Sequence, residues 1–161
     1  MENIHPLAET YSHKTRVRVC GLLVQNNTLL LACHKAAFGS GFFWMPPGGG
    51  LDFGEKVKDC LVREFREETG LEVEVGRFLY LNEFLRSPLH AIELFFEVKL
   101  VKGTLALGSD PEHASHAQLL EDVKFLSIRD MFQLKRDELH PILHALVNLD
   151  DLFIPRQIFL D

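Results

Sequence analysis

The chain has 161 residues, of which 47% are hydrophobic and 25% are charged, a balance typical of one globular domain with a buried core. Its 23 acidic and 17 basic residues give a net charge of -6 and include no long basic run, which argues against duplex nucleic acid as a partner. Because no segment has the roughly 20 apolar residues of a membrane span or the apolar core of a signal peptide, we expect a single cytoplasmic domain over residues 1–161 without a membrane partner.

The first part of the chain predicts strands followed by a loop. RVRVCGLLV (16–24) and TLLLACHK (28–35) are apolar, branched runs on either side of QNN, a pattern that predicts a strand hairpin with a tight polar turn. AAFGSGFFWMPPGGG (36–50) is rich in glycine and proline, which disfavours a helix and indicates a loop.

The second half predicts further strands and then helices. The expected strands are LEVEVGRFLYLNEF (71–84), AIELFFEVKLV (91–101) and VKFLSI (123–128), and the expected helical segments are IRDMFQL (128–134) and ELHPILHALVNL (138–149). This order favours an α/β fold in which a mixed sheet carries helices on its faces. The cysteines are Cys20, Cys33 and Cys60, and their apolar surroundings favour buried free thiols over disulfides or a metal site.

A helix is predicted over residues 56–69, beginning near Glu55 and ending at Gly70, a residue type suited to the left-handed position after a last turn. At 3.6 residues per turn, its apolar side chains gather on one side. These inward-facing residues are Val57, Cys60, Leu61 and Phe65. We expect this side to pack on the sheet.

Three acids continue the inward side of this helix. Glu64, Glu67 and Glu68 have the spacing i, i+3 and i+4, so they repel one another, and burying them is costly unless a positive charge compensates them. A hard divalent cation such as Mg²⁺ would do so through oxygen ligands. The alternative is a solvated acidic helix end paired with Arg63 and Arg66, although acids near a helix C-terminus oppose its dipole.

A glycine-rich loop leads directly into this helix. PPGGGLDFGE (46–55) contains four glycines and two prolines in ten residues, and such a backbone can approach a ligand closely. A loop of this kind is a weak signal alone. Its position before the acidic helix suggests that a backbone carbonyl completes the metal shell.

From Gly49 to Leu71 the chain reads GGLDFGEKVKDCLVREFREETGL, which resembles the Nudix box. That motif consists, in order, of G, five residues of any type, E, seven residues, RE, a bulky apolar residue, one residue, EE, one residue, G and an apolar residue. Every fixed position is filled here, and the one soft departure is Phe65, where the family more often has Ile, Leu or Val. The resemblance implies a Nudix-like α/β/α sandwich with a mixed β-sheet.

The resemblance also implies an activity, namely metal-dependent pyrophosphohydrolysis in which water attacks a phosphorus of a nucleoside diphosphate derivative. The implied ligands of Mg²⁺, or of Mn²⁺ as the alternative metal, are the Gly49 carbonyl, Glu64, Glu67 and Glu68. Arg63 would orient the glutamates by ion pairing, and Glu55 would support the helix and the outer metal shell. Metals in such sites neutralise the diphosphate and activate water.

The general base and the substrate contacts are less narrowly defined. Glu64 is the first choice for the base, with Glu112 and Glu121 of the polar stretch GSDPEHASHAQLLED (108–122) in reserve. Lys35 ends a predicted strand beside His34, where a cation could meet a phosphate or simply be solvated. Trp44 could stack on a base or, as we favour, pack under the sheet.

Other readings remain open at this level. The favoured substrate is a nucleotide sugar or ADP-ribose, with a nucleoside triphosphate or a non-catalytic nucleotide-sensing role as alternatives. The histidine pairs are His113 with His116 and His140 with His144, and we favour surface histidines over zinc ligands because no third ligand is suitably spaced. The apolar tail suits either a homodimer interface or the domain's own sheet.

Overall fold

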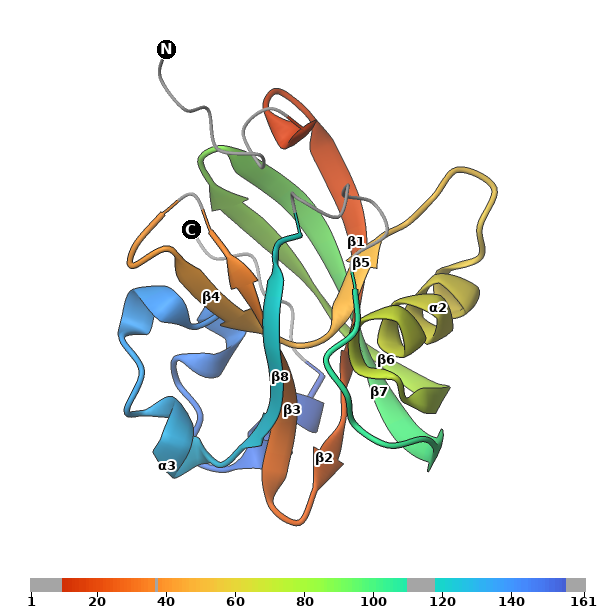
Figure 1. The fold of residues 1–161 in the computed structure, drawn as a ribbon, viewed down its shortest axis with the longest axis vertical. Helices are drawn as coiled ribbons and strands as arrows, with labels where there is room; N and C mark the ends of the chain where they lie inside the picture. The colour runs from red at the N-terminus through yellow and green to blue at the C-terminus, as the bar shows by residue number, and fades with distance from the viewer. Residues whose placement is uncertain (1–9, 37, 110–117, 156–161) are drawn as a thin grey trace.

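The computed structural model describes residues 10–36, 38–109 and 118–155 and places eight strands in two sheets (Figure 1). The strands are β1 (Thr15–Leu22), β2 (Val24–Gln25), β3 (Thr28–Lys35), β4 (Phe42–Met45), β5 (Gly48–Gly50), β6 (Glu72–Arg86), β7 (Leu89–Lys102) and β8 (Leu120–Leu126). The helices are α2 (Val57–Thr69) and α3 (Ile128–Met131), and the 3-10 turns are η2 (Arg136–Glu138), η3 (Pro141–Leu143) and η4 (Leu149–Phe153).

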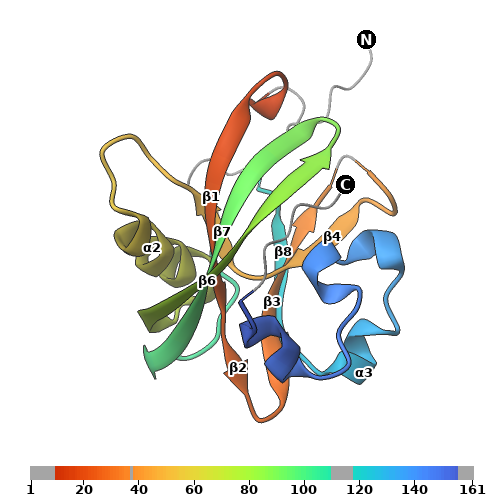
Figure 2. The same ribbon diagram turned by 180° about the vertical axis from the view of Figure 1, so that it is seen from behind.

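The first sheet has the order β5-β1-β7-β6 and is mixed, because β1 runs parallel to β7 while the other pairs are antiparallel. The second sheet has the order β2-β3-β4, and β8 also pairs with β3. α2 lies on one side of the sheets, and α3 with the 3-10 turns lies on the other (Figures 1 and 2). The predicted α/β sandwich with a mixed sheet is therefore confirmed. None of the described helices is long and apolar enough to cross a bilayer.

Two hydrophobic clusters hold these layers together. Successive side chains of a strand point to opposite faces, and β3 shows this directly, because Leu30 belongs to the cluster under α2 while Leu29 and Leu31 belong to the cluster under the C-terminal turns. The α2 cluster includes Val19, Cys60, Leu61, Phe65, Phe96 and Val98. The other cluster includes Cys20, Leu22, Phe95, Leu143, Leu146 and Leu152. A strand between two such layers must be apolar on both faces.

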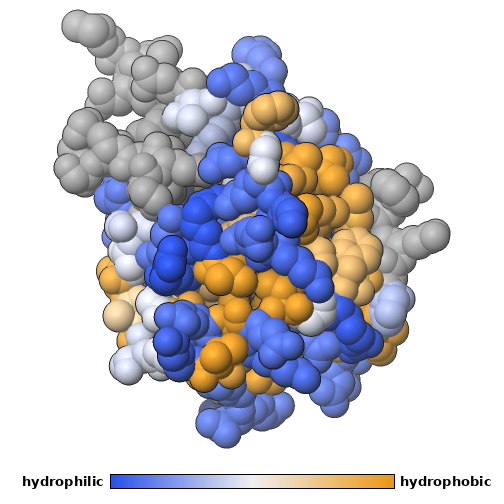
Figure 3. Space-filling model, turned by 90° about the vertical axis from the view of Figure 1, so that its right-hand side faces the viewer, coloured by the Kyte–Doolittle hydropathy of each residue, from blue (hydrophilic) through white to orange (hydrophobic). Residues whose placement is uncertain are grey.

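α2 forms as predicted, with bounds that shift by a residue. Gly70 follows its last turn with φ 71°, in the left-handed region, and its N–H donates to Arg66 O. Cys60, Leu61 and Phe65 are buried, while the side of the molecule that carries α2 shows hydrophilic and hydrophobic residues intermixed on its surface (Figure 3). All three cysteines are buried and free, as the sequence predicted.

The predicted hairpin is wrong in its first strand. The run 16–24 is divided between β1, which joins the first sheet, and β2, and only β2 pairs with β3. The turn itself is tight, with Asn26 at φ 48° and Asn27 at φ 58°, a conformation that asparagine tolerates. Residues 36–50, expected to be a loop, contain β4 and β5. An apolar run does not reveal a change of sheet partner within it.

The C-terminal helices are shorter than expected. Segment 128–134 forms only the single turn α3, and segment 138–149 forms 3-10 turns instead of an α-helix. Pro141 at the start of η3 has no N–H to donate, and the Asn148 side chain accepts a bond from Asp151 N and starts η4. Such local caps divide the segment into turns.

A row of buried polar side chains crosses the first sheet. Arg18 is the register partner of Glu93 on β7, and Glu93 is the partner of Asn82 on β6. Glu93 Oε2 accepts bonds from Asn82 Nδ2 at 2.9 Å and from His140 Nε2 at 2.8 Å. His140 is completely buried, so the expectation of a surface histidine is wrong here. Burial alone would raise the pKa of Glu93, but His140, Arg18 and Asn82 together lower it.

The packing of α2 yields a stability prediction. We expect Leu61→Ala to lower the free energy of unfolding by about 2–5 kcal/mol, because it deletes a fully buried side chain and leaves a cavity. Val62→Ala, at the neighbouring exposed position, should change it by less than about 0.5 kcal/mol. Urea denaturation measures both, and equal losses would contradict this packing.

The buried row yields a pH prediction. Glu93→Gln should destabilise the protein by about 1–3 kcal/mol at pH 7, since it removes the charged acceptor of a buried network. A lowered folded-state pKa stabilises the fold above the unfolded-state pKa of about 4.3, and this contribution disappears as the pH falls towards the folded value. The melting temperatures of the parent and the variant should therefore begin to converge as the pH falls below about 4. If the difference in melting temperature between parent and variant stays constant down to about pH 3, the pKa of Glu93 is not lowered. Glu74→Gln, on the exposed side of β6, serves as the control.

Candidate active site

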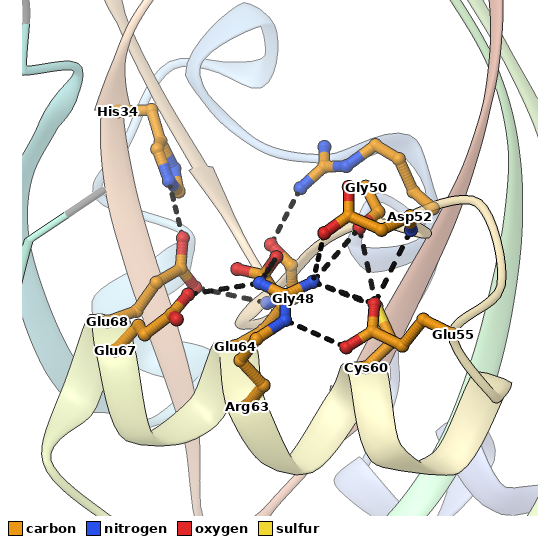
Figure 4. A network of polar contacts seen from close by, with 11 residues as sticks. His34, Gly48, Gly50, Asp52, Glu55, Cys60, Arg63, Glu64, Glu67 and Glu68 are labelled. Atoms are coloured by element: carbon orange, nitrogen blue, oxygen red, sulfur yellow. Dashed lines mark hydrogen bonds and ion pairs between the residues drawn. The ribbon is translucent and has the colours of Figure 1, made fainter. Parts of the chain in front are cut away.

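The acids of α2 lie where the helix meets the glycine-rich strand β5 (Figure 4). Glu64 and Glu68 are 6% and 4% exposed, although they are carboxylates, and Glu67 is half-buried. They are drawn inward because Cys60, Leu61 and Phe65 bury the same side of the helix. Helical spacing thus brings the three predicted glutamates to one place.

Arg63 is the hub of the ion pairs on α2. Its Nε and Nη2 donate to the two carboxylate oxygens of Glu55 at 2.8 and 3.0 Å, and its Nη1 donates to Glu64 Oε1 at 2.7 Å and to Glu67 Oε2 at 3.0 Å. Nη2 also donates to Gly50 O at 3.3 Å. The hydrogen bond from Arg63 lowers the pKa of Glu55. Arg63 therefore touches every residue that it was predicted to orient except Glu68.

Glu68 is held from the two sheets instead. His34 Nε2, at the end of β3, donates to Glu68 Oε1 at 2.9 Å, and Gly48 N, on β5, donates to Oε2 at 3.0 Å. The polar end of β3 is the signal that could have indicated His34. The contact from Gly48 is not local in sequence and follows from the placement of β5 beside α2.

Two glycines make this close approach feasible. A side chain at Gly48, where φ is 152°, would overlap the backbone of Val19, and a side chain at Gly49 would overlap the Glu64 carboxylate. The backbone of the glycine-rich loop therefore runs directly against the acids, as the sequence indicated. At Gly48 only a residue without a Cβ fits, whereas at Gly49 a Cβ would force the Glu64 carboxylate to move.

The donor chemistry fits a hard cation. Glu64 and Glu68 are nearly buried carboxylates, Glu67 lies beside them, and the Gly49 backbone runs against Glu64. Oxygen donors of this kind suit Mg²⁺ or Mn²⁺. Within the described residues no group of three or more His, Cys, Asp or Glu side chains converges as a finished metal site, because the carboxylates are turned onto Arg63, His34 and Gly48 N.

A small cleft of about 80 Å³ opens beside these acids. Its lining includes the acids Glu64 and Glu68, the basic residues Arg16, Arg18 and Lys35, and the apolar residues Phe38, Phe43 and Met45. Arg18 was not singled out from the sequence. Its signal is the alternation RVRV in β1, which places Arg16 and Arg18 on one face of a strand whose other residues are apolar.

The remaining predicted residues have different surroundings. Lys35 lines the cleft and pairs with Glu121 Oε1 at 2.7 Å, so this reserve candidate for the base holds a lysine at the start of β8. Trp44 is partly buried and packs against the hydrophobic cluster under the C-terminal turns. It is not among the described residues that line the cleft. Glu112 lies outside the described residues, as do His113 and His116.

Comparison with known proteins identifies relatives. Residues 14–146 match the NUDIX domain. The chain is 33% identical over 105 residues to ADP-ribose pyrophosphatase of Methanocaldococcus jannaschii, covering 64% of this chain and 62% of that protein. It is 40% identical over 65 residues to nucleoside triphosphatase NudI of Enterobacter sp., covering 38% of this chain and 45% of that protein. The chain thus spans less than two thirds of the length of these relatives.

Solved structures share the fold at low sequence identity. A NUDIX hydrolase from Nitrosomonas europaea has a TM-score of 0.65 at 19% identity, covering 81% of this chain and 84% of that chain. The MutT NUDIX hydrolase from Burkholderia pseudomallei has a TM-score of 0.61 at 22% identity, covering 78% and 94%. These similarities support the sandwich architecture.

The contact between Gly49 and Glu64 can be tested directly. We expect Gly49→Ala to weaken Mg²⁺ binding by about 10–100-fold, because the added methyl group displaces the Glu64 carboxylate. Mg²⁺-dependent changes in melting temperature measure the affinity. Gly54→Asn is the control, since that site in the same loop has open space and asparagine tolerates its φ of 85°. If Gly49→Ala keeps the Mg²⁺ affinity of the parent, Glu64 is not a ligand of the metal.

Proposed function

The chain belongs to the Nudix family, and on that premise we propose that it is a pyrophosphohydrolase that cleaves the diphosphate of a nucleoside diphosphate derivative. The favoured substrates are nucleotide sugars and ADP-ribose. The observation that carries the proposal is that two nearly buried carboxylates, Glu64 and Glu68, open onto a cleft that is both basic and aromatic.

The proposed metal ligands are the Gly49 carbonyl, Glu64, Glu67 and Glu68. A bound Mg²⁺ or Mn²⁺ ion would supply charge neutralisation of the diphosphate and a water of lowered pKa. Arg63 orients two of these carboxylates from one guanidinium group, and its fork on Glu55 holds that group in place. A guanidinium group with this many hydrogen bonds has little freedom to rotate. It therefore keeps the carboxylates of Glu64 and Glu67 in fixed orientations.

Glu64 is the proposed general base. Its carboxylate lies against the Gly49 backbone at the edge of the cleft, where a water attacking phosphorus would pass its proton. Glu121, the reserve candidate, is engaged with Lys35. Glu64 is ion-paired as well, with Arg63. It is preferred because it lies among the proposed metal ligands, where the attacking water would be held, whereas Glu121 lies at the start of β8.

The rest of the cleft suits a nucleotide. Phe38 and Phe43 both line the cleft and form an edge-to-face pair with centroids 5.2 Å apart. Arg86, which lines a neighbouring pocket, covers one face of the Phe38 ring at 3.9 Å. Such surfaces accept the flat face of a base. Arg16 and Lys35 offset the charge of the phosphates. A nucleoside triphosphate is the second candidate, favoured by the similarity to NudI. The homodimer, the cytoplasmic location and the single domain over residues 1–161 stay predictions.

A hydrolysis screen tests this function. We expect the parent with Mg²⁺ to cleave ADP-ribose or nucleotide sugars into a nucleoside monophosphate and a sugar phosphate, whereas a triphosphate would release pyrophosphate. Glu67→Gln should reduce the rate by about 100-fold or more, because it removes a charged metal ligand. Exposed Glu74→Gln should leave the rate unchanged.

The screen also has a defined negative outcome. If the parent cleaves no nucleotide while one of them raises its melting temperature, the chain is a nucleotide sensor. The presence of every acid of the motif argues for catalysis, because a sensor has no need of the costly burial of Glu64 and Glu68.

A further inference from the structure

We propose that Arg18, held by Glu93, is a positioning residue that sets the Gly48 peptide and, through it, the Glu68 carboxylate. The inference rests on the proposed function, since Glu68 is there a metal ligand. Arg18 lies 3.8 Å from Glu93 through Nη1 and donates from Nη2 to Gly48 O at 3.0 Å. Gly48 N donates in turn to Glu68 Oε2 at 3.0 Å.

The Glu93 end of this connection is fixed. Glu93 is 1% exposed, and its Oε2 accepts bonds from both His140 and Asn82. Ile142 N donates to His140 Nδ1, so Nε2 carries the proton that is donated to Glu93. His140 N also donates to Trp44 O. The carboxylate therefore cannot turn without breaking contacts to the C-terminal turns and to β6.

Two peptide groups meet at Gly48. The one that carries its N–H is held by the bond from Gly21 N to Pro47 O at 3.0 Å, and the one that carries its carbonyl is contacted by Arg18. Gly48 has no side chain, and its backbone adopts φ 152° in a space where a Cβ would overlap Val19. Its carbonyl and N–H, on either side of the same residue, contact Arg18 and Glu68 respectively. Without the bond from Arg18, the donor to Glu68 would be held on this side by the Gly21 bond alone, and rotation at Gly48 would shift it. Figure 4 shows the contact between Gly48 and Glu68 as a dashed line.

Glu93 also determines where the charge of Arg18 is directed. The side chain of Arg18 is 15% exposed, and its guanidinium lies 3.8 Å from Glu93 Oε1 and lines the same cleft as Glu68 and Glu64. A buried cation requires a nearby anion. If Glu93 loses its charge, Glu68 and Glu64 are the remaining anions close to Arg18, and their carboxylates would turn towards it. Glu93 thus keeps Arg18 from competing with a metal ion for the glutamates.

Glu93→Gln tests this role with little change in shape. Apparent Mg²⁺ affinity, measured from the Mg²⁺ dependence of the melting temperature and from Mn²⁺ binding by electron paramagnetic resonance, should weaken by about 10–100-fold. Glu97→Gln is the matched control, because Glu97 also lies on β7 and pairs with an arginine of a neighbouring strand, Arg77, at 2.8 Å. We expect the control to keep the parent's affinity.

Arg18→Lys provides a second variant in case Glu93→Gln folds poorly. Lysine lacks the planar fork that lets one group address both Glu93 and Gly48 O, so its Mg²⁺ affinity should fall as well. A readout without metal is the amide resonance of Gly48, which should lose its downfield shift and exchange faster in both variants. Both changes should be absent from Glu97→Gln.

The outcomes separate this inference from the proposed function. If both variants melt earlier but keep Mg²⁺ affinity within twofold and an unchanged Gly48 amide, the buried row is only structural and the inference is overturned. If the parent hydrolyses no nucleotide but the Gly48 amide responds as expected, the positioning stands and the function falls. A parent that binds no Mg²⁺ would overturn both Glu68 as a metal ligand and the purpose assigned to Arg18.

Discussion

The cost of placing carboxylates inside a protein governs this structure. Glu64, Glu68 and Glu93 are all nearly inaccessible, and an ionised carboxylate that leaves water without compensation is strongly unfavourable. Each carboxylate is compensated by its own hydrogen-bond donors. Glu64 accepts from Arg63, and Glu68 accepts from His34 and the Gly48 N–H. Glu93 accepts from His140 and Asn82. The arrangement of strands around α2 can be understood as the means of supplying these donors.

The glycines of β5 connect this electrostatic requirement to the backbone. A strand with side chains could not lie in the same place against the acidic end of α2, because a Cβ at Gly48 would overlap the Val19 backbone and one at Gly49 would overlap the Glu64 carboxylate. The same strand pairs with β1, which carries Arg18. Bringing β5 so close therefore joins the acids of the helix to the polar row across the first sheet.

How much of this could be predicted depends on the range of each contact. The acids of α2 and their contact with Arg63 follow from helical spacing within a few residues, so the sequence predicted them well. The pairing of β1 with β7 joins residues more than 70 positions apart, and the placement of His140 against Glu93 spans 47. Such contacts are decided by packing of the whole chain, and no local pattern distinguishes an isolated glutamate in β7 from a solvated one. Likewise, the apolar run through β1 and β2 gave no sign of where the chain changes sheets.

The two donors to Glu68 belong to different sheets: His34 to the second and Gly48 to the first. The Glu68 carboxylate therefore lies at the junction of the two sheets. Its position depends on how the sheets are placed relative to each other. A shift of about 1 Å at a reacting group can cost roughly a hundredfold in rate, which is far less movement than is needed to expose the hydrophobic clusters. On warming, a small shift of one sheet against the other would displace the Glu68 carboxylate and abolish the proposed activity. Circular dichroism would still report an intact fold. We therefore expect the proposed activity to be lost on warming before the fold is, with the packing between the sheets setting the earlier loss.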